Sequence, residues 1–244
     1  MTDSWLQAEW PAPSFIQAGT TLRQGGVSTG EYSSLNIATH VGDELTSVEK
    51  NRLRLNLPNE PQWLEQVHST KVILLPHEEF IPKADAAYTE KENIICSVMT
   101  ADCLPLLITN KQGSCVAAIH AGWRGLCNGI IEATIQSLPA EPESLLVWLG
   151  PAIGPDVYEV GEEVYEAYTK ANNEAKQAFT SVSEKHWLFD IYKVAKLRLH
   201  SSGVKQVFGG DRCTFTEKDK FFSYRRDNVT GRMASMIWIE PDKR

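Results

Sequence analysis

Three apolar segments between residues 94 and 120 restrict the possible folds more than any other feature of the sequence. Residues 94–99, 104–109 and 115–120 are rich in Ile, Val, Leu and Ala and contain no Asp, Glu, Lys or Arg. Runs of this length and composition are typical of strands whose two faces are both covered. We therefore expect a central sheet with other layers packed against it.

Predicted helices and further strands alternate around these segments. Apolar residues at helical spacing predict helices at residues 47–57, 126–138, 159–171 and 190–204. Strands are predicted at residues 14–20, at 62–75 as two strands around a polar turn, in 144–155 before a Gly-Pro, and at 221–239 as two strands joined at Thr230-Gly231. The Gly- and Ser-rich residues 21–36 are predicted to form a loop. The fold class is therefore α/β (α+β), as a single domain over residues 1–244.

The composition limits the classes of partner. The chain has 244 residues, of which 42% are hydrophobic and 23% charged, so it can form one large core. Its net charge is −7, which argues against nucleic acid and anionic membranes as partners. No apolar stretch reaches the roughly 20 residues that a bilayer requires, and the acidic, proline-interrupted start is unlike a signal peptide. Five cysteines, an odd number, indicate reduced thiols. We expect a cytoplasmic protein that acts on a small molecule.

Polar side chains stand where the apolar segments end. Cys103 and His120 lie at the ends of two of these segments, and His68 lies at the predicted polar turn. If the three converge, two imidazoles and one thiolate form a zinc ligand set with a fourth position free for water or substrate. A structural zinc would need a fourth protein ligand, and no Cys-x-x-Cys pair exists. Asp102 is the nearest carboxylate for a supporting or general-base role, although neighbours along a strand point to opposite faces.

The same residues allow two other interpretations. In the first, Cys103 is a nucleophile and His120 its base, without a metal. In the second, His68 and His120 are structural histidines with hydrogen-bonded rings. The remaining histidines occupy polar or helical contexts and are assigned no site role; they are His40, His77, His186 and His200.

Several arginines are candidates for binding an anion. Arg124 lies in a Gly-Trp-Arg-Gly stretch between a predicted strand and a helix, where backbone N–H groups can also bind anions. Arg23 lies in the predicted loop 21–36, which lacks the Lys-Ser/Thr ending of a P-loop. Arg212 and the Arg225-Arg226 pair could also hold an anion, although paired arginines are more often solvated surface groups.

Longer motifs resemble a known family. They are WLEQVHSTKV (63–72), VMTADCLPLL (98–107), AAIHAGWRGL (117–126), WLGPAIGP (148–155), YEVGEEV (158–164), FGGDRCTFTE (208–217), FFSYRRD (221–227) and TGRMAS (230–235). Together they resemble the YfiH family, also called laccase-domain or multicopper polyphenol oxidase proteins, over about residues 10–240.

The resemblance implies a fold, a metal site and a set of substrate contacts. The implied fold is a single domain of mixed β-sheets sandwiched between helical layers (α/β/β/α, CNF1/YfiH-like). The implied zinc ligands are His68, Cys103 and His120, which with Asp102 form the candidate catalytic group. The candidates for binding substrate or phosphate are Arg23, Asn36, Gln66, Arg124 and Arg212.

The resemblance also implies several activities. The first is zinc-dependent phosphorolysis of the purine nucleosides adenosine, inosine, guanosine and methylthioadenosine, together with adenosine deamination. The second is an amidase activity that removes L-Ser from the precursor UDP-MurNAc-L-Ser, in peptidoglycan editing. A metal-binding partner in cell-wall or division complexes is a third, non-enzymatic option. The polyphenol oxidase (laccase) name implies copper, but several coppers need many His ligands, and six scattered histidines cannot supply them.

Overall fold

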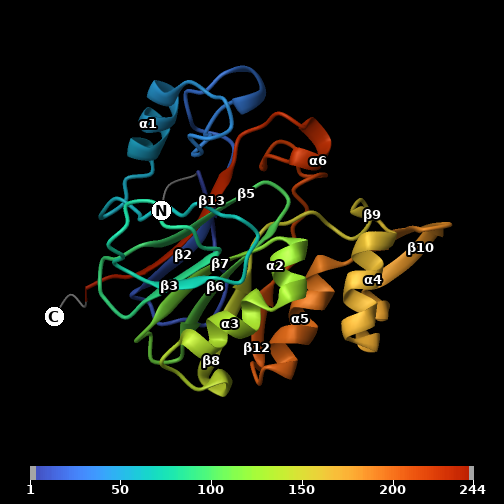
Figure 1. Ribbon diagram of the computed structural model, residues 1–244. Coiled ribbons are helices and arrows are strands. Elements are labelled where there is room, and N and C mark those ends of the chain that lie inside the picture. The colour runs from blue at the N-terminus through green and yellow to red at the C-terminus, as the bar shows by residue number, and fades with distance from the viewer. Residues whose placement is uncertain (1–3, 242–244) are drawn as a thin grey trace.

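A six-stranded mixed sheet forms the centre of the molecule in the computed structural model, which describes residues 4–241 (Figure 1). Its strand order is β12-β8-β6-β7-β4-β3. The bounds are β3 (Val72–Leu74), β4 (Ala86–Thr89), β6 (Leu104–Asn110), β7 (Val116–Ala121), β8 (Leu145–Leu149) and β12 (Gln206–Gly209). The central strands β6, β7 and β8 pair antiparallel, whereas the outer pairs β12-β8 and β3-β4 are parallel. Every residue of β6, β7 and β8 is buried, which confirms the expectation of strands covered on both faces.

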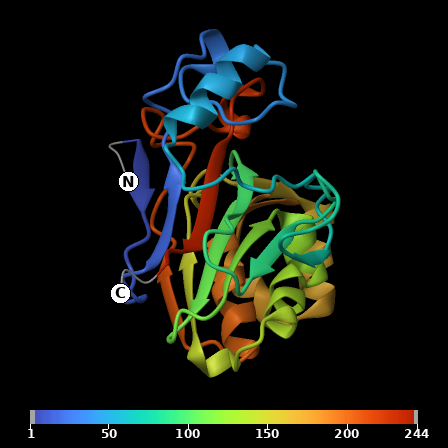
Figure 2. The same ribbon diagram turned by 90° about the vertical axis from the view of Figure 1, so that its left-hand side faces the viewer.

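A four-stranded antiparallel sheet packs on one face of the central sheet (Figure 2). Its order is β1-β2-β13-β5, with bounds β1 (Trp5–Gln7), β2 (Ile16–Thr21), β5 (Cys96–Thr100) and β13 (Met233–Ile239). The two sheets share a core in which Val98 and Ile237 of the smaller sheet meet Leu107 and Ala118 of the larger one. The chain passes directly from one sheet to the other between β5 and β6, so residues 101–103 lie where the two sheets diverge.

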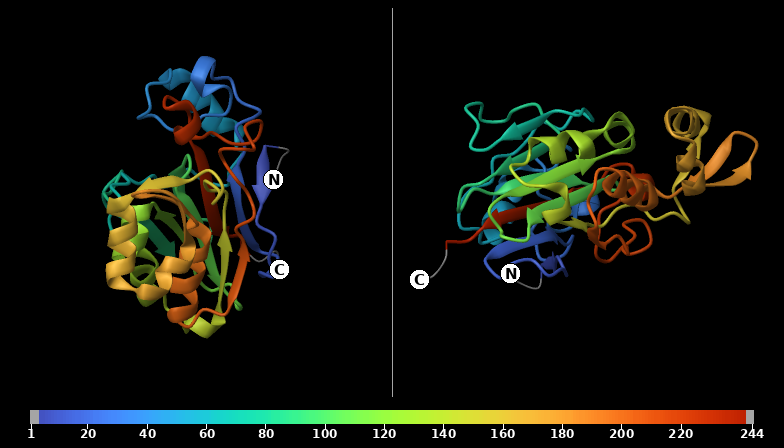
Figure 3. Two further views of the ribbon diagram at one scale, coloured as in Figure 1. Left: turned by 90° about the vertical axis from the view of Figure 1, so that its right-hand side faces the viewer. Right: turned by 90° about the horizontal axis from the view of Figure 1, so that it is seen from below.

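Helices cover the other face of the central sheet (Figures 1 and 3). They are α2 (Trp123–Asn128), α3 (Ile130–Ser137), α4 (Glu162–Ala171) and α5 (Ile191–Ser201). Their buried side chains, such as Ile131 and Leu199, join Leu106 and Ile119 of the sheet in the largest core cluster. A three-stranded sheet, β10-β11-β9, lies beside α4; its strands are β9 (Glu159–Gly161), β10 (Phe179–Ser183) and β11 (His186–Phe189).

Loops and short helices cover the outer face and one end of the four-stranded sheet. They include α1 (Leu45–Arg54), α6 (Tyr224–Asp227) and the 3-10 helix η1 (Gly30–Tyr32), all near the top of Figure 1. Leu35, Leu55 and Trp63 of this layer pack on Met236 of β13. Two further 3-10 helices, η2 (Pro142–Ser144) and η3 (Asn173–Ala178), lie in connections on the helical side. The mixed α/β fold class is therefore confirmed, with an outer layer made mostly of loops.

The structure corrects the prediction of two strands at residues 62–75. Residues 62–71 form an extended loop, and only β3 is a strand. The backbone N–H groups of Val67, His68 and Ser69 donate to the Asp85 carboxylate, which replaces the hydrogen bonds of a ladder. A single side chain thus overrides the β-propensity of this segment.

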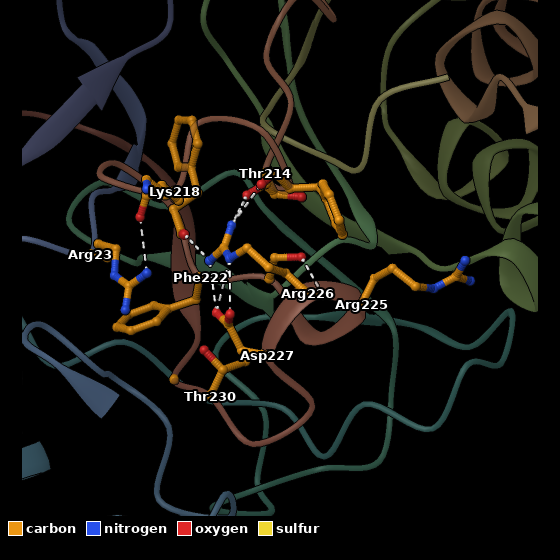
Figure 4. A network of polar contacts seen from close by, with 12 residues as sticks. Arg23, Thr214, Lys218, Phe222, Arg225, Arg226, Asp227 and Thr230 are labelled. Carbon is orange, nitrogen blue, oxygen red and sulfur yellow. Dashed lines mark hydrogen bonds and ion pairs between the residues drawn. The ribbon is translucent and has the colours of Figure 1, made fainter. Parts of the chain in front are cut away.

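The prediction of two strands at residues 221–239 is also wrong in its first half, where helix α6 stands instead. Ser223 caps this helix by accepting a hydrogen bond from the backbone N–H of Arg226. The Arg226 guanidinium donates to the carbonyl oxygens of Thr214, Phe215 and Phe221, at 2.8, 2.9 and 3.0 Å (Figure 4). These tertiary bonds satisfy the loop without a second strand.

The helix predicted at 126–138 is divided into α2 and α3. Gly129 separates them with a φ of 101°, a backbone conformation that favours glycine. Among residues 4–241, none of the helices has the length and apolar character needed to cross a membrane.

Candidate metal centre

His68, Cys103 and His120 meet at one point where the sheets diverge. Cys103 stands just before β6, His120 lies in β7 opposite Pro105 of β6, and His68 extends from the loop before β3. Their ligand atoms all lie within 4.8 Å of one another, and the Cys103 Sγ is 3.9 Å from the His68 Nε2. The two imidazole rings stand edge to face, with centroids 4.7 Å apart. No other such group of three His, Cys, Asp or Glu occurs within residues 4–241.

Gly122 leaves the space that this cluster occupies. A Cβ at position 122 would lie 2.6 Å from the His68 Cδ2 and 3.2 Å from the Cys103 Sγ. Both distances are shorter than an ordinary van der Waals contact, so any side chain at position 122 would displace His68 or Cys103. The Gly in the His-Ala-Gly-Trp stretch thus serves the site as well as the turn into α2.

Asp85 holds two of the three ligands, and the sequence analysis missed it. Its buried carboxylate lies 2.8 Å from the His120 Nδ1 and accepts hydrogen bonds from the backbone N–H groups of His68 and Ser69, at 2.9 and 2.6 Å. His68 has a φ of 59°, which is unusual for a residue other than glycine, and these bonds keep it there. The bond to Nδ1 directs the His120 Nε2 toward Cys103. A lone Asp in the apolar stretch 84–88 was the available signal.

The electrostatics of the cluster favour a thiolate. Burial raises the pKa of the Cys103 thiol, but the adjacent His120 and His68 imidazoles outweigh this effect and lower it to about 6. Burial lowers the pKa of His120, but the Cys103 thiolate and Asp85 raise it to about 9. Burial likewise raises the pKa of Asp85, yet its hydrogen bonds with His120 and Ser69 lower it to about 2. A thiolate is therefore available at neutral pH, both for a metal and for attack on a substrate.

The donor set fits a zinc ion. Zinc accepts Cys and His ligands at about 2.0–2.3 Å in tetrahedral geometry, which places ligand atoms roughly 3.5–4 Å apart. The observed separations, all within 4.8 Å, are close to this spacing. Three protein ligands leave one coordination position, and the three side chains border a cavity through which a substrate can reach it.

This cavity has a volume of about 870 Å³ and is lined by side chains of several kinds. The apolar lining residues include Trp63, Phe80, Ile81 and Met99. The cationic and polar lining residues include His40, Arg52, Thr100 and Arg232, and two carboxylates, Glu60 and Glu65, also border the cavity. Ligand sites of this volume commonly combine apolar walls with a few polar groups. Arg52, Arg232 and Thr100 are lining residues that the sequence analysis did not select, because α1, β5 and the segment before β13, which carry them, are far apart in the chain.

Most residues selected as substrate or phosphate contacts lie elsewhere or have bonded side chains. Arg23 lies outside the cavity, where it donates to the carbonyl oxygens of Ser33 and Lys218 (Figure 4). Arg124 is exposed and pairs with Glu163, and Arg212 pairs with Glu217 at 3.4 Å. Gln66 borders the cavity, but both ends of its amide are bonded to the backbone of Met99.

Asn36 and Asp102 are buried and connect loops. The Asn36 Oδ1 accepts from the backbone N–H groups of Ala38 and Arg232. The Asp102 carboxylate accepts from the Thr214 hydroxyl and the backbone N–H of Arg225, both at 2.6 Å. Asp102 thus ties α6 to the β5–β6 connection, whereas Asp85 is the carboxylate that contacts the imidazoles.

Comparisons of the sequence with a family model and with individual relatives indicate the same family. The family model described as multi-copper polyphenol oxidoreductase laccase matches residues 17–240. The chain belongs to this family. A family relative from Escherichia coli (strain K12), called purine nucleoside phosphorylase YfiH, is 52% identical over 236 residues, covering 95% of this chain and 97% of the relative. A Haemophilus influenzae relative, called purine nucleoside phosphorylase, is 48% identical and covers 96% of this chain and 99% of its own length.

Solved structures of the family share the fold. The crystal structure of Neisseria meningitidis protein NMB0706 superposes with a TM-score of 0.93 at 44% identity, covering 98% of this chain and 100% of that one. YlmD from Geobacillus stearothermophilus superposes with a TM-score of 0.89 at 29% identity, covering 99% and 98%.

Proposed function

We propose that this protein is a zinc-dependent purine nucleoside phosphorylase. The observation that carries the proposal is the His68, Cys103 and His120 group at the border of a cavity that is also lined by aromatic and cationic side chains. Relatives called purine nucleoside phosphorylase, which align over nearly the whole chain, support the choice of substrate class. A purine nucleoside offers a flat base for the apolar lining residues and hydroxyl groups for the polar lining residues.

The residues of the chain have separate tasks in this proposal. His68, Cys103 and His120 would hold zinc, which supplies a Lewis acid able to polarise an oxygen or nitrogen of the substrate. Asp85 orients His120 and the loop of His68, so that the ligands are arranged before the substrate enters. Phe80, whose side chain is exposed and lines the cavity, offers a ring face on which a purine base can stack.

Adenosine deamination is a second candidate for the same site. The observation that favours it is the ligand set, because a zinc ion held by His and Cys side chains with one open position is also used for base deamination. Copper oxidation is disfavoured by the donors, since residues 4–241 contain one group of three ligands with only two histidines.

The experiment incubates the zinc-loaded protein with inosine, with and without phosphate, and measures hypoxanthine and ribose 1-phosphate by chromatography. We expect both products only with phosphate, and inosine from adenosine if the site also deaminates. His68→Ala should lose zinc and activity. His200→Ala is the matched control, because His200 is exposed on α5 and does not border the cavity.

The amidase hypothesis is tested in parallel with UDP-MurNAc-L-Ser as substrate. Release of serine from this precursor, without phosphate-dependent release of purine base, would replace the phosphorylase proposal with the amidase. Full activity of the chelated, metal-free protein would instead support a Cys103-His120 nucleophile.

A further inference from the structure

The cationic and polar residues that line the cavity combine features that suit one particular ligand. We propose that Arg232, Arg52 and His40, with the Thr100 hydroxyl, form the subsite that binds inorganic phosphate. This inference rests on the proposed phosphorylase function and assigns the second substrate of that reaction to named residues. It differs from the sequence-based candidates Arg23, Arg124 and Arg212, whose guanidiniums lie outside the cavity.

Arg232 has hydrogen-bonding capacity that the protein does not use. It is half-buried between α6 and β13, and its Nη1 donates to the carbonyl oxygens of Thr230 and Gly231, at 2.9 and 3.0 Å. Within residues 4–241 its Nε and Nη2 make no hydrogen bond, and it forms no ion pair. Burial lowers the pKa of Arg232, and the nearby negative charges of Cys103 and Asp102 offset this only in part. An arginine that is partly desolvated and unpaired in a cavity is suited to an anion.

Arg52 and His40 extend this positive region. Arg52 lies over the Trp63 ring at 4.1 Å and donates to the carbonyl oxygen of Ile37. The exposed Glu60 carboxylate is 3.9 Å from its guanidinium, and Glu49 is a second nearby carboxylate. Partial desolvation lowers the pKa of His40, and the charges of Arg232 and Arg52 lower it further. The positive charges of both guanidiniums are therefore close enough to affect the His40 imidazole. A neutral His40 can still donate a hydrogen bond to an oxyanion.

Thr100 adds a hydroxyl group with unused hydrogen-bonding capacity. Its side chain borders the cavity and is only 2% exposed, yet its hydroxyl has no hydrogen-bonding partner among the described residues. Buried hydroxyl groups are nearly always bonded, so Thr100 has unused hydrogen-bonding capacity beside the cavity, as Thr230, close to Arg232 in the chain, also has. Thr100 pairs with Met233, the neighbour of Arg232, across the β5-β13 ladder. The hydroxyl and the guanidinium thus belong to the same end of the sheet.

Neighbouring residues, one of which also lines the cavity, fix the position of Arg232. Asn36 accepts a hydrogen bond from the Arg232 backbone N–H at 2.9 Å, and its amide also bonds Asp43. The Arg232 guanidinium lies 5.9 Å from the Tyr224 ring of α6. This arrangement prepares the charge for its ligand before binding and limits the entropy lost.

The proposed reaction balances with phosphate in this subsite. An oxygen of hydrogenphosphate forms a bond with C1′ of the ribose, and the bond from C1′ to the purine nitrogen breaks. The electron pair stays on the base, which takes up the proton that the hydrogenphosphate carried. The products are the free base and ribose 1-phosphate, and no oxidant, reductant or further reactant is needed. A cavity of about 870 Å³ has room for both substrates.

The test measures binding of inorganic phosphate to the zinc-loaded protein by calorimetry, and the KM for phosphate with inosine. We expect Arg232→Gln to weaken phosphate binding and to raise this KM roughly 10- to 100-fold, from the loss of one or two charge-assisted hydrogen bonds. The KM for inosine should change far less. Arg52→Gln should act in the same direction and serves if Arg232→Gln does not fold; Arg232→Lys should recover part of the loss.

Arg54→Gln is the matched control. Arg54 lies on α1 two residues from Arg52 but outside the cavity, so its replacement should leave phosphate binding unchanged. Equal phosphate binding by wild-type protein, Arg232→Gln and Arg52→Gln would overturn the subsite, even if phosphorolysis is found. Phosphate binding that depends on Arg232 without any phosphorolysis would support the subsite and remove the proposed function. Binding of uridine diphosphate but not of phosphate would also overturn it.

Discussion

Two polar clusters in this protein differ in how far the protein satisfies their hydrogen-bonding groups. In the Arg226 cluster, one guanidinium donates to three backbone carbonyls and to Asp227, so its hydrogen bonds are spent on holding loops together (Figure 4). In the metal centre, the Asp85 carboxylate bonds the His120 Nδ1 and the backbone N–H of His68. The Cys103 Sγ and one nitrogen of each imidazole lie within 4.8 Å of one another. We call a cluster closed when its polar atoms are hydrogen-bonded within the protein, which indicates a structural role. We call it open when polar atoms converge without such bonds, which indicates a site for a ligand.

The largest expected effect is on metal binding at the open cluster. Cys103→Ala removes the only thiolate of the three ligands and should weaken zinc affinity more than about 1000-fold, roughly 4 kcal/mol. Competition with a chromophoric chelator measures this change. Cys127→Ala, in α2 and outside the group, is the control. Undiminished zinc affinity in Cys103→Ala would remove the ligand assignment.

The closed cluster should respond in stability and not in metal binding. Arg226→Met leaves the carbonyl oxygens of Thr214, Phe215 and Phe221 without their donor and should lower the free energy of unfolding by about 3 kcal/mol. Urea denaturation measures this loss, and zinc stoichiometry should stay the same below the transition. A large loss of zinc in the folded variant would contradict the distinction between the clusters.

Asp85 combines features of both clusters, because its carboxylate is hydrogen-bonded within the protein and also contacts the candidate metal ligand His120. Asp85→Asn keeps the shape of the side chain but removes the charge that orients His120. We expect zinc affinity to fall roughly 10- to 100-fold, as for other groups that support metal-bound histidines. Isothermal titration with zinc checks this. Asp102→Asn is the comparison, since Asp102 contacts Thr214 and Arg225 and should change zinc affinity much less.

A smaller effect is expected on the chemical reactivity of Cys103 at the same site. In metal-free protein, alkylation of Cys103 should rise with pH to a half-maximal rate near its pKa of about 6, because only the thiolate reacts. Buried Cys115, whose pKa burial raises to about 11, should react slowly throughout. Zinc should slow the alkylation of Cys103 about tenfold or more. Mass spectrometry of each cysteine peptide separates these rates.

The smallest effect is expected at an arginine that the sequence favoured. Arg124→Gln breaks an exposed ion pair with Glu163 and touches no lining residue of the cavity, so the KM for phosphate should change less than about twofold. A tenfold rise would show that Arg124 moves into the cavity and would shift the phosphate site away from Arg232.

The sequence supported much of the fold, since the apolar runs that became β5, β6, β7 and β8 declare their burial in their own composition. It failed where side chains replace backbone pairing. Ser69, in the loop before β3, is held by the Asp85 carboxylate 16 residues away, and Arg226 of α6 bonds the carbonyl oxygens of Thr214 and Phe215, 12 and 11 residues away. Local propensity carries no information about such distant bonds.

The amino-acid sequence by itself determined the covered sheet, the mixed α/β class and the residue types able to bind a metal, because periodicity and composition are local properties. Only the tertiary structure decided that His68, Cys103 and His120 converge, that Asp85 supports them, and that Arg52 and Arg232 share their cavity. These facts depend on where sheets and loops far apart in the chain come together. Packing of the whole core determines that, and no short segment encodes it alone.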